Sequence, residues 1–126
     1  TRYQDWSRGL GDVYKRQVMI QSVKAGRILD LPSLPTLSDG TAGGVEPGSI
    51  TLEFCRELVD DYMTVTELEI KESLREFVQT QHMLIEGSAA VAAAAFKKLA
   101  DRWAGKNVVV IICGGNISLE TLKTIL

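Results

Sequence analysis

The chain has 126 residues, of which 45% are hydrophobic and 24% are charged, as in an ordinary folded domain, so disordered and low-complexity proteins are excluded. Its 14 basic and 16 acidic residues give a formal net charge of −2, which excludes the basic surface expected of a nucleic-acid or anionic-lipid binder. The apolar runs at 89–96 and 108–113 are far shorter than the roughly 20 residues that cross a membrane. With two cysteines, Cys55 and Cys113, and no signal-peptide pattern, we expect a cytoplasmic protein without membrane or nucleic-acid partners.

Residues 1–17 show neither a two-residue nor a 3.6-residue apolar period, so the sequence predicts no packed element there. Their second part, SRGLGDVYKRQ at 7–17, resembles a translated transposase-type sequencing adapter. We therefore expect 1–17 to be a non-native segment and 18–126 to be the biological chain. Because 1–17 holds four basic and two acidic residues, the net charge of 18–126 is −4.

The next part of the chain predicts two helices separated by a loop. Residues 18–27 form the first helix, which Gly26 can end in a left-handed conformation. Residues 31–49 hold all three prolines and several glycines and are expected to be a loop. Residues 50–59 form the second helix, with Ser49 as a candidate N-cap. Its apolar positions share one face: Ile50, Phe54 and Leu58.

A short strand at 62–65 precedes the clearest helix start in the chain. Thr66 can accept a hydrogen bond from the amide of Glu69 while the Glu69 side chain reaches back, which is a capping box. The apolar face that follows is formed by Ile70, Leu74, Phe77, Val78 and Ile85. An alanine-rich helix is then predicted at 87–103, stopped by Gly105.

The last elements indicate an α/β fold. Residues 107–113, NVVVIIC, form a continuous β-branched run, which is typical of a strand buried on both faces of a parallel sheet. Residues 118–126 are predicted to be helical, with Asn116 or Ser118 as the cap. Helices alternating with strands in this order are typical of the α/β class.

The first candidate site is the segment CGGN at 113–116, directly after the predicted buried strand. In open α/β sheets ligands bind at the carboxyl ends of strands, and two glycines let a ligand approach the backbone amides that precede a helix. The alternative is a tight turn that binds nothing, because the motif is too short to be specific.

Two further segments could each have a functional or a purely structural role. The loop TLSDGTAGG at 36–44 could cradle phosphate through its amides or be only a loop. Glu86 could serve a bound group or cap the alanine-rich helix. The one histidine, His82, and the acidic run 67–72, with Glu67 opposite Lys71, are expected on solvated helix surfaces, and no metal site is expected.

Four segments together resemble the C-terminal third of the threonine/serine dehydratase and serine racemase family. They are TLSDG at 36–40, VDDYMTVTELEI at 59–70, IEGSAA at 85–90 and VVVIICGGN at 108–116. Members of that family are fold-type II pyridoxal-phosphate enzymes. The resemblance implies that 18–126 is the C-terminal part of a tryptophan-synthase-β-like parallel-sheet domain, incomplete on its own.

The resemblance implies that the cofactor is pyridoxal 5'-phosphate. It places Cys113 opposite the pyridine nitrogen, where a neutral thiol cannot keep that nitrogen protonated as an aspartate would. A weaker electron sink favours β-elimination over transamination. The residues that the resemblance assigns to cofactor binding are Cys113, Gly114, Gly115, Asn116, Glu86 and Gly40.

The family's Schiff-base lysine lies in a Ser-x-Lys-x-Arg setting, which no lysine of this chain has, so we expect no catalytic residue here and no turnover by the fragment alone. The resemblance implies a parent homodimer or higher homo-oligomer that deaminates L-threonine or L-serine to a 2-keto acid and ammonia. Serine racemase, or another hydroxy-amino-acid dehydratase of the family, is the alternative. A second alternative is a non-catalytic α/β ligand-binding or assembly module.

Overall fold

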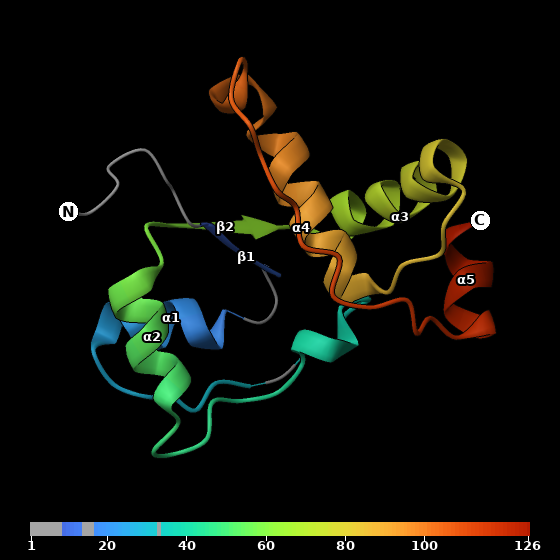
Figure 1. Cartoon of the computed structure of the whole chain (residues 1–126). Helices are drawn as coiled ribbons and strands as arrows, with labels where there is room; N and C mark the ends of the chain where they lie inside the picture. Colours follow the sequence, from blue (N-terminus) through green and yellow to red (C-terminus); the bar gives the residue numbers. More distant parts are fainter. Residues whose placement is uncertain (1–8, 14–16, 33) are drawn as a thin grey trace.

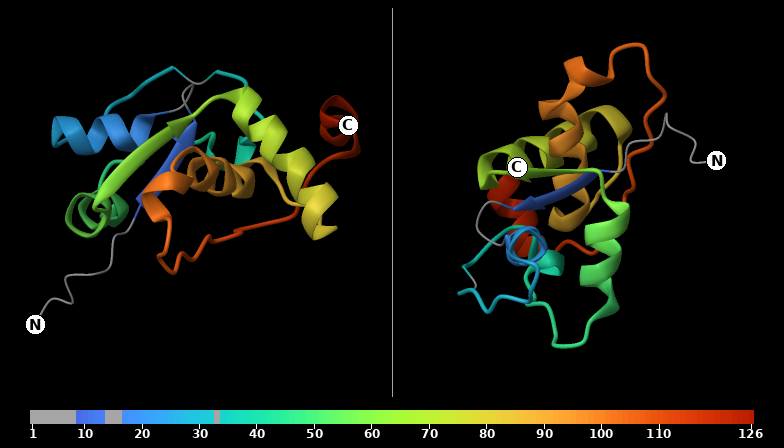
Figure 2. Two further views of the ribbon diagram at one scale, coloured as in Figure 1. Left: turned by 90° about the horizontal axis from the view of Figure 1, so that it is seen from above. Right: turned by 90° about the vertical axis from the view of Figure 1, so that its left-hand side faces the viewer.

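The computed structural model describes residues 9–13, 17–32 and 34–126 (Figure 1). The regular elements in chain order are β1 (Gly9–Val13), α1 (Val18–Ala25), α2 (Ile50–Leu58), β2 (Asp61–Val65), α3 (Glu67–Gln81), α4 (Gly87–Lys98) and α5 (Leu119–Ile125). Two short 3-10 helices, η1 (Asp39–Thr41) and η2 (Ala100–Trp103), lie between them. Figures 1 and 2 show α1 and α2 together at one end of the molecule and α3 and α5 at the other, with the strands between. No helix among the described residues has the length and apolar character needed to cross a membrane.

The expectation that 1–17 holds no packed element is wrong for residues 9–13. These residues form β1, which pairs in parallel with β2 in a register that runs from Gly9 opposite Asp61 to Val13 opposite Val65. Parallel pairing rests on backbone hydrogen bonds, so it does not require the apolar period that the segment lacks. Gly11 also allows close packing, because a Cβ there would lie 3.2 Å from a methyl carbon of Val91 on α4. The rest of the segment, 1–8 and 14–16, lies outside the described residues.

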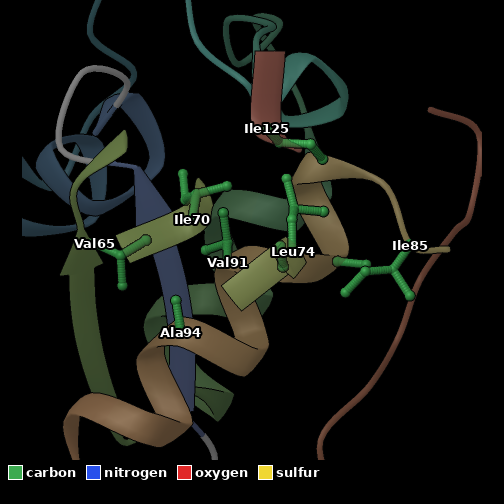
Figure 3. Packing of buried hydrophobic residues seen from close by; sticks show 9 residues of the cluster. Val65, Ile70, Leu74, Ile85, Val91, Ala94 and Ile125 are labelled. Carbon is green, nitrogen blue, oxygen red and sulfur yellow. The ribbon is translucent and has the colours of Figure 1, made fainter. Parts of the chain in front are cut away.

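The core is formed where α3 packs on α4 (Figure 3). Ile70 and Leu74 of the predicted apolar face are 0% and 1% exposed, and Phe77 packs at the edge of the same cluster. Ile85 is buried as well, although α3 ends at Gln81 and Ile85 follows it in an extended segment. The alanines of α4 let the two helices approach closely, as the composition of 87–103 predicts.

The predicted helix boundaries are largely confirmed. Gly26 ends α1 with a φ of 67°, and α3 begins with the full capping box of Thr66 and Glu69. Ser118 caps α5 by accepting a hydrogen bond of 3.0 Å from the Thr121 amide. Ser49 precedes α2 but makes no side-chain capping bond.

Two helix ends differ from the prediction. The helix expected over 87–103 ends at Lys98 and continues as η2, and Gly105 follows with a φ of 75°. His82 is exposed, as expected, but it is the left-handed C-cap of α3, with a φ of 55°. The apolar side chains of α2 share one face but remain exposed: Ile50, Phe54 and Leu58.

The buried strand predicted at 107–113 is not formed. The segment is extended and runs back along α4, but it pairs with neither described strand (Figure 1). Ile112 packs against the core, whereas Val109 is 88% exposed and Ile111 is 74% exposed. Strand formation needs a hydrogen-bonded neighbour, and the two described strands, β1 and β2, pair with each other and not with this segment.

Candidate cofactor-binding site

Three segments that are far apart in the sequence meet at the first turn of α4. They are the loop that contains η1, the start of α4 at Glu86, Gly87 and Ser88, and residues 113–116 (Figure 1). The sequence predicts a candidate site in each of these segments, and the fold brings all three to one place.

Glu86 is the residue that the three segments share. Its amide donates a hydrogen bond of 3.1 Å to the Gly114 carbonyl, which holds the extended segment against the helix start. One carboxylate oxygen, Oε1, accepts the Ser88 hydroxyl, and the other, Oε2, accepts the Asn116 amide at 3.3 Å. Glu86 is the N-cap of α4 by position, but its side chain makes no capping bond to the helix. Glu86 therefore occupies the start of the alanine-rich helix, as the capping interpretation predicts, but without a side-chain hydrogen bond to a helix amide.

Three glycines at this junction lie in close contact with their neighbours, one with backbone atoms and two with side-chain ends. A Cβ on Gly114 would lie 2.4 Å from Oε2 of Glu86, and a Cβ on Gly40 would lie 3.0 Å from Oγ of Ser88. A Cβ on Gly87 would lie only 1.8 Å from the Leu37 carbonyl oxygen. Close contact with backbone thus requires glycine at position 87, and none of the three glycines has a positive φ.

Cys113 joins the same group through Ser88. Its Sγ donates to Oγ of Ser88 at 3.7 Å, and the side chain of Cys113 is otherwise exposed. Gly115 lies next to this cluster, and a Cβ there would be 3.1 Å from the Leu84 carbonyl oxygen, without any contact to Glu86. Of the six predicted site residues, Glu86 is a member of the Glu86–Ser88 pair, four contact this pair directly, and Gly115 borders it.

Sequence reasoning missed two residues that build the site. Ser88 lies inside the motif IEGSAA and bridges Glu86 to Cys113, so its place in that motif was the available signal. Glu67 was expected on a solvated face opposite Lys71, but it holds the η1 loop instead. Its carboxylate accepts the Thr36 hydroxyl at 2.5 Å and the Leu37 amide at 2.8 Å.

The donor set suits an organic cofactor better than a metal. The cluster offers a thiol, a hydroxyl, a carboxylate and backbone amides. Its glycines leave the backbone accessible to a bound molecule. Among the described residues, no group of three or more His, Cys, Asp or Glu side chains could hold a metal ion.

The family described as "Pyridoxal-phosphate dependent enzyme" matches residues 12–114 of this chain, and the chain belongs to it. The match begins within β1, inside the segment 1–17, and ends at Gly114, within the cluster around Glu86. Enzymes of this family depend on pyridoxal phosphate, which is the cofactor that the sequence predicts.

Similar proteins include enzymes that act on hydroxy amino acids. The chain is 38% identical over 109 residues to the catabolic L-threonine dehydratase TdcB of Escherichia coli strain K12, covering 85% of this chain and 33% of that protein. It is 32% identical over 106 residues to an L-threo-3-hydroxyaspartate ammonia-lyase of a Pseudomonas species, covering 84% of this chain and 33% of that enzyme. The chain therefore spans about a third of the length of these relatives.

Solved structures confirm the predicted fold-type II class. Maize serine racemase matches with a TM-score of 0.79 and 28% identity, over 94% of this chain and 37% of that one. Threonine deaminase isoform 2 of Solanum lycopersicum shares the fold, with a TM-score of 0.87 and 24% identity over 98% of this chain and 34% of that one. The described elements are thus part of a larger α/β domain.

Proposed function

We propose that the full-length protein is a pyridoxal-phosphate-dependent ammonia-lyase. It converts L-threonine or L-serine to a 2-keto acid and ammonia by β-elimination. The observation that carries this proposal is the convergence of Cys113, Gly114, Asn116 and Gly40 on the Glu86–Ser88 pair, in a chain that belongs to this cofactor's family.

In this proposal the chain supplies one wall of the cofactor site. Bound pyridoxal phosphate would supply the electron sink for elimination from the amino acid. Cys113 would face the pyridine nitrogen, and Gly114 would let the backbone approach the ring edge. Glu86 holds the 113–116 turn against α4 through its amide and its carboxylate.

We further propose that the η1 loop borders the same wall on the side of the substrate, as the resemblance implies for residues 39 and 40. Gly40 packs on Ser88, and the loop is fixed to α3 through Thr36, Leu37 and the carboxylate of Glu67. A loop held in this way presents a fixed surface, which a site that must orient a small amino acid needs.

The 126-residue chain should have no activity by itself. No lysine of this chain lies in the Ser-x-Lys-x-Arg setting that the resemblance assigns to the Schiff base, so this lysine has to come from the rest of the full-length protein. We therefore expect catalytic activity from the full-length protein and none from the 126-residue chain.

The experiment is a 2-keto acid assay on the purified full-length protein loaded with pyridoxal phosphate. L-threonine and L-serine are offered separately, with glycine as the control that has no β-hydroxyl group. We expect keto acid from at least one hydroxy amino acid and none from glycine. Cofactor binding without keto acid from either substrate would overturn the proposed reaction and favour a non-catalytic ligand-binding module.

Serine racemase is the second candidate, because maize serine racemase matches 94% of this chain at 28% identity. The same samples, analysed for D-serine by chiral chromatography, distinguish the two reactions. D-serine formed faster than pyruvate from L-serine would replace the ammonia-lyase by the racemase.

A further inference from the structure

Glu67, in the first turn of α3, makes hydrogen bonds to the segment that leads into the η1 loop. Its Oε1 accepts the Thr36 hydroxyl, and its Oε2 accepts the Leu37 amide at 2.8 Å. Oγ1 of Thr36 in turn accepts the Ser38 amide at 3.1 Å. Ser38 is fully buried and directly precedes η1, so the hydrogen bonds run without a break from α3 to the start of η1.

The partners of Glu67 call for a carboxylate. The Leu37 amide can only donate, and the Thr36 hydroxyl accepts from Ser38 and gives its proton to Glu67. An ionised carboxylate accepts on both oxygens, and hydrogen bonds to a charged acceptor are the strong ones. A glutamine of the same size has one acceptor oxygen and an NH2 group that only donates. Glu67 therefore satisfies two donors where a glutamine would satisfy one.

Leu37 lies between the two helices that carry the site. Its amide is bonded to Glu67 on α3, and its carbonyl oxygen lies against the first turn of α4, where a Cβ on Gly87 would be 1.8 Å away. The Leu37 side chain packs at the edge of the core. The bonds of Glu67 thus hold the backbone of Leu37 against α4.

Gly40 is the residue that this anchoring places at the site. A Cβ on Gly40 would lie 3.0 Å from Oγ of Ser88 and 3.5 Å from Oε1 of Glu86. The hydrogen bonds within 38–42 shape η1 itself, whereas the bonds of Glu67 link the loop to α3. The place of Gly40 beside the Glu86–Ser88 pair therefore depends on Glu67.

We propose that Glu67 is a positioning residue for the cofactor site, because its carboxylate holds the η1 loop where Gly40 can line bound pyridoxal phosphate. This step rests on the proposed function, in which the cofactor lies beside the Glu86–Ser88 pair. Glu67 itself does not touch the cofactor. Without its bonds the loop takes up other positions, and the apparent affinity falls with the fraction of molecules that have the loop in place.

The first measurement is hydrogen exchange in the full-length protein without cofactor, read by mass spectrometry on the peptide that contains Leu37 and Ser38. Glu67→Ala removes both acceptors, so exchange of these amides should become at least about tenfold faster, as expected for the loss of a hydrogen bond to a charged group. Glu67→Gln keeps one acceptor and should lie between. The control is Glu72→Ala, which removes an exposed carboxylate from the same helix and should leave the exchange unchanged.

The second measurement is the dissociation constant for pyridoxal phosphate, determined by equilibrium dialysis of the same cofactor-free proteins. We expect it to rise at least about threefold in Glu67→Ala, by less in Glu67→Gln, and not at all in Glu72→Ala. Thr36→Val removes the hydroxyl that Glu67 accepts and leaves α3 intact, so it should shift both measurements in the same direction.

Unchanged exchange in Glu67→Ala would overturn the proposal, and so would faster exchange with an unchanged dissociation constant. If Glu67→Ala does not fold, the same two results in Thr36→Val decide the question. Neither measurement contains an amino-acid substrate, so failure here is distinct from failure of the keto acid assay.

Discussion

Two apolar regions of this chain have similar composition and opposite surroundings. The face of α3 that carries Ile70 and Leu74 is packed against the alanines of α4 and is fully buried. The run at 107–113 is at least as apolar, yet its outward side chains, Val109 and Ile111, are among the most exposed in the described residues. The apolar composition of both regions predicts burial. It does not tell whether the segment that covers each region lies within this chain.

The comparison also explains why the cluster around Glu86 is formed here and the strand at 107–113 is not. The cluster around Glu86 needs only contacts among the η1 loop, α4 and 113–116, all of which the chain contains. A parallel strand at 107–113 needs hydrogen-bonded neighbours, and the relatives that contain this region are about three times as long. We therefore expect the outer face of 107–113 to be covered in the full-length protein.

The largest expected effect concerns the close contact between Gly87 and the backbone of Leu37. Gly87→Ala places a methyl group against the backbone of Leu37, which cannot rotate away, so we expect a loss of about 4 kcal/mol in unfolding free energy or no folded protein. Urea unfolding of the full-length protein measures it. Gly44→Ala is the matched control, because a Cβ at Gly44 meets nothing within 4 Å, and it should change stability by less than about 0.5 kcal/mol. Equal effects of the two substitutions would contradict the proposed packing.

The second effect compares a buried side chain of α3 with an exposed side chain of residues 107–113. In the full-length protein, Leu74→Ala and Ile111→Ala should each cost about 3 kcal/mol, as large-to-small substitutions in a core do. The result for Ile111 is the informative one, since a side chain that is 74% exposed would ordinarily cost less than about 0.5 kcal/mol. An Ile111→Ala protein as stable as the wild type would show that this face stays uncovered.

A smaller effect concerns the start of α3, which positions the buried face. Thr66→Ala removes the side-chain acceptor of the capping box, so we expect a loss of about 1 kcal/mol in unfolding free energy. Ser49→Ala is the control at the start of α2, where no side-chain capping bond exists, and it should be nearly neutral. A cost for Ser49 equal to that for Thr66 would mean that the capping box adds nothing of its own.

The smallest effect is a pH dependence at the same helix start. Burial raises the pKa of Glu69, but hydrogen bonds from the Thr66 backbone and from Lys98 outweigh it and hold that pKa below the ordinary value of 4.5. A lowered pKa contributes stability that is present above pH 4.5 and is lost as the pH falls below it. The stability difference between wild type and Glu69→Gln should therefore be constant at neutral pH and shrink in acid. A difference that grows as the pH falls would give the opposite sign and contradict this.

Local signals in the sequence predicted the helices and their caps. The capping box of Thr66 and the left-handed Gly26 each depend on a few neighbouring residues, and the structure agrees with both. The site residues followed from the resemblance and stay a prediction. Two features could not be predicted from neighbouring residues in the sequence. The pairing of β1 depends on a partner some fifty residues away in the chain, and the role of Ser88 depends on the distance to Cys113 across the fold.

The most direct test of the central claim is the dehydratase rate of the full-length protein with Cys113→Asp. If Cys113 lies at the pyridine nitrogen, an aspartate there keeps the nitrogen protonated, strengthens the electron sink and shifts the reaction toward transamination. We expect keto acid release from L-threonine or L-serine by elimination to fall at least about tenfold, equivalent to about 1.4 kcal/mol in the barrier, while cofactor absorbance shows that pyridoxal phosphate remains bound. An unchanged elimination rate in cofactor-loaded Cys113→Asp would contradict the placement of this cluster beside the cofactor.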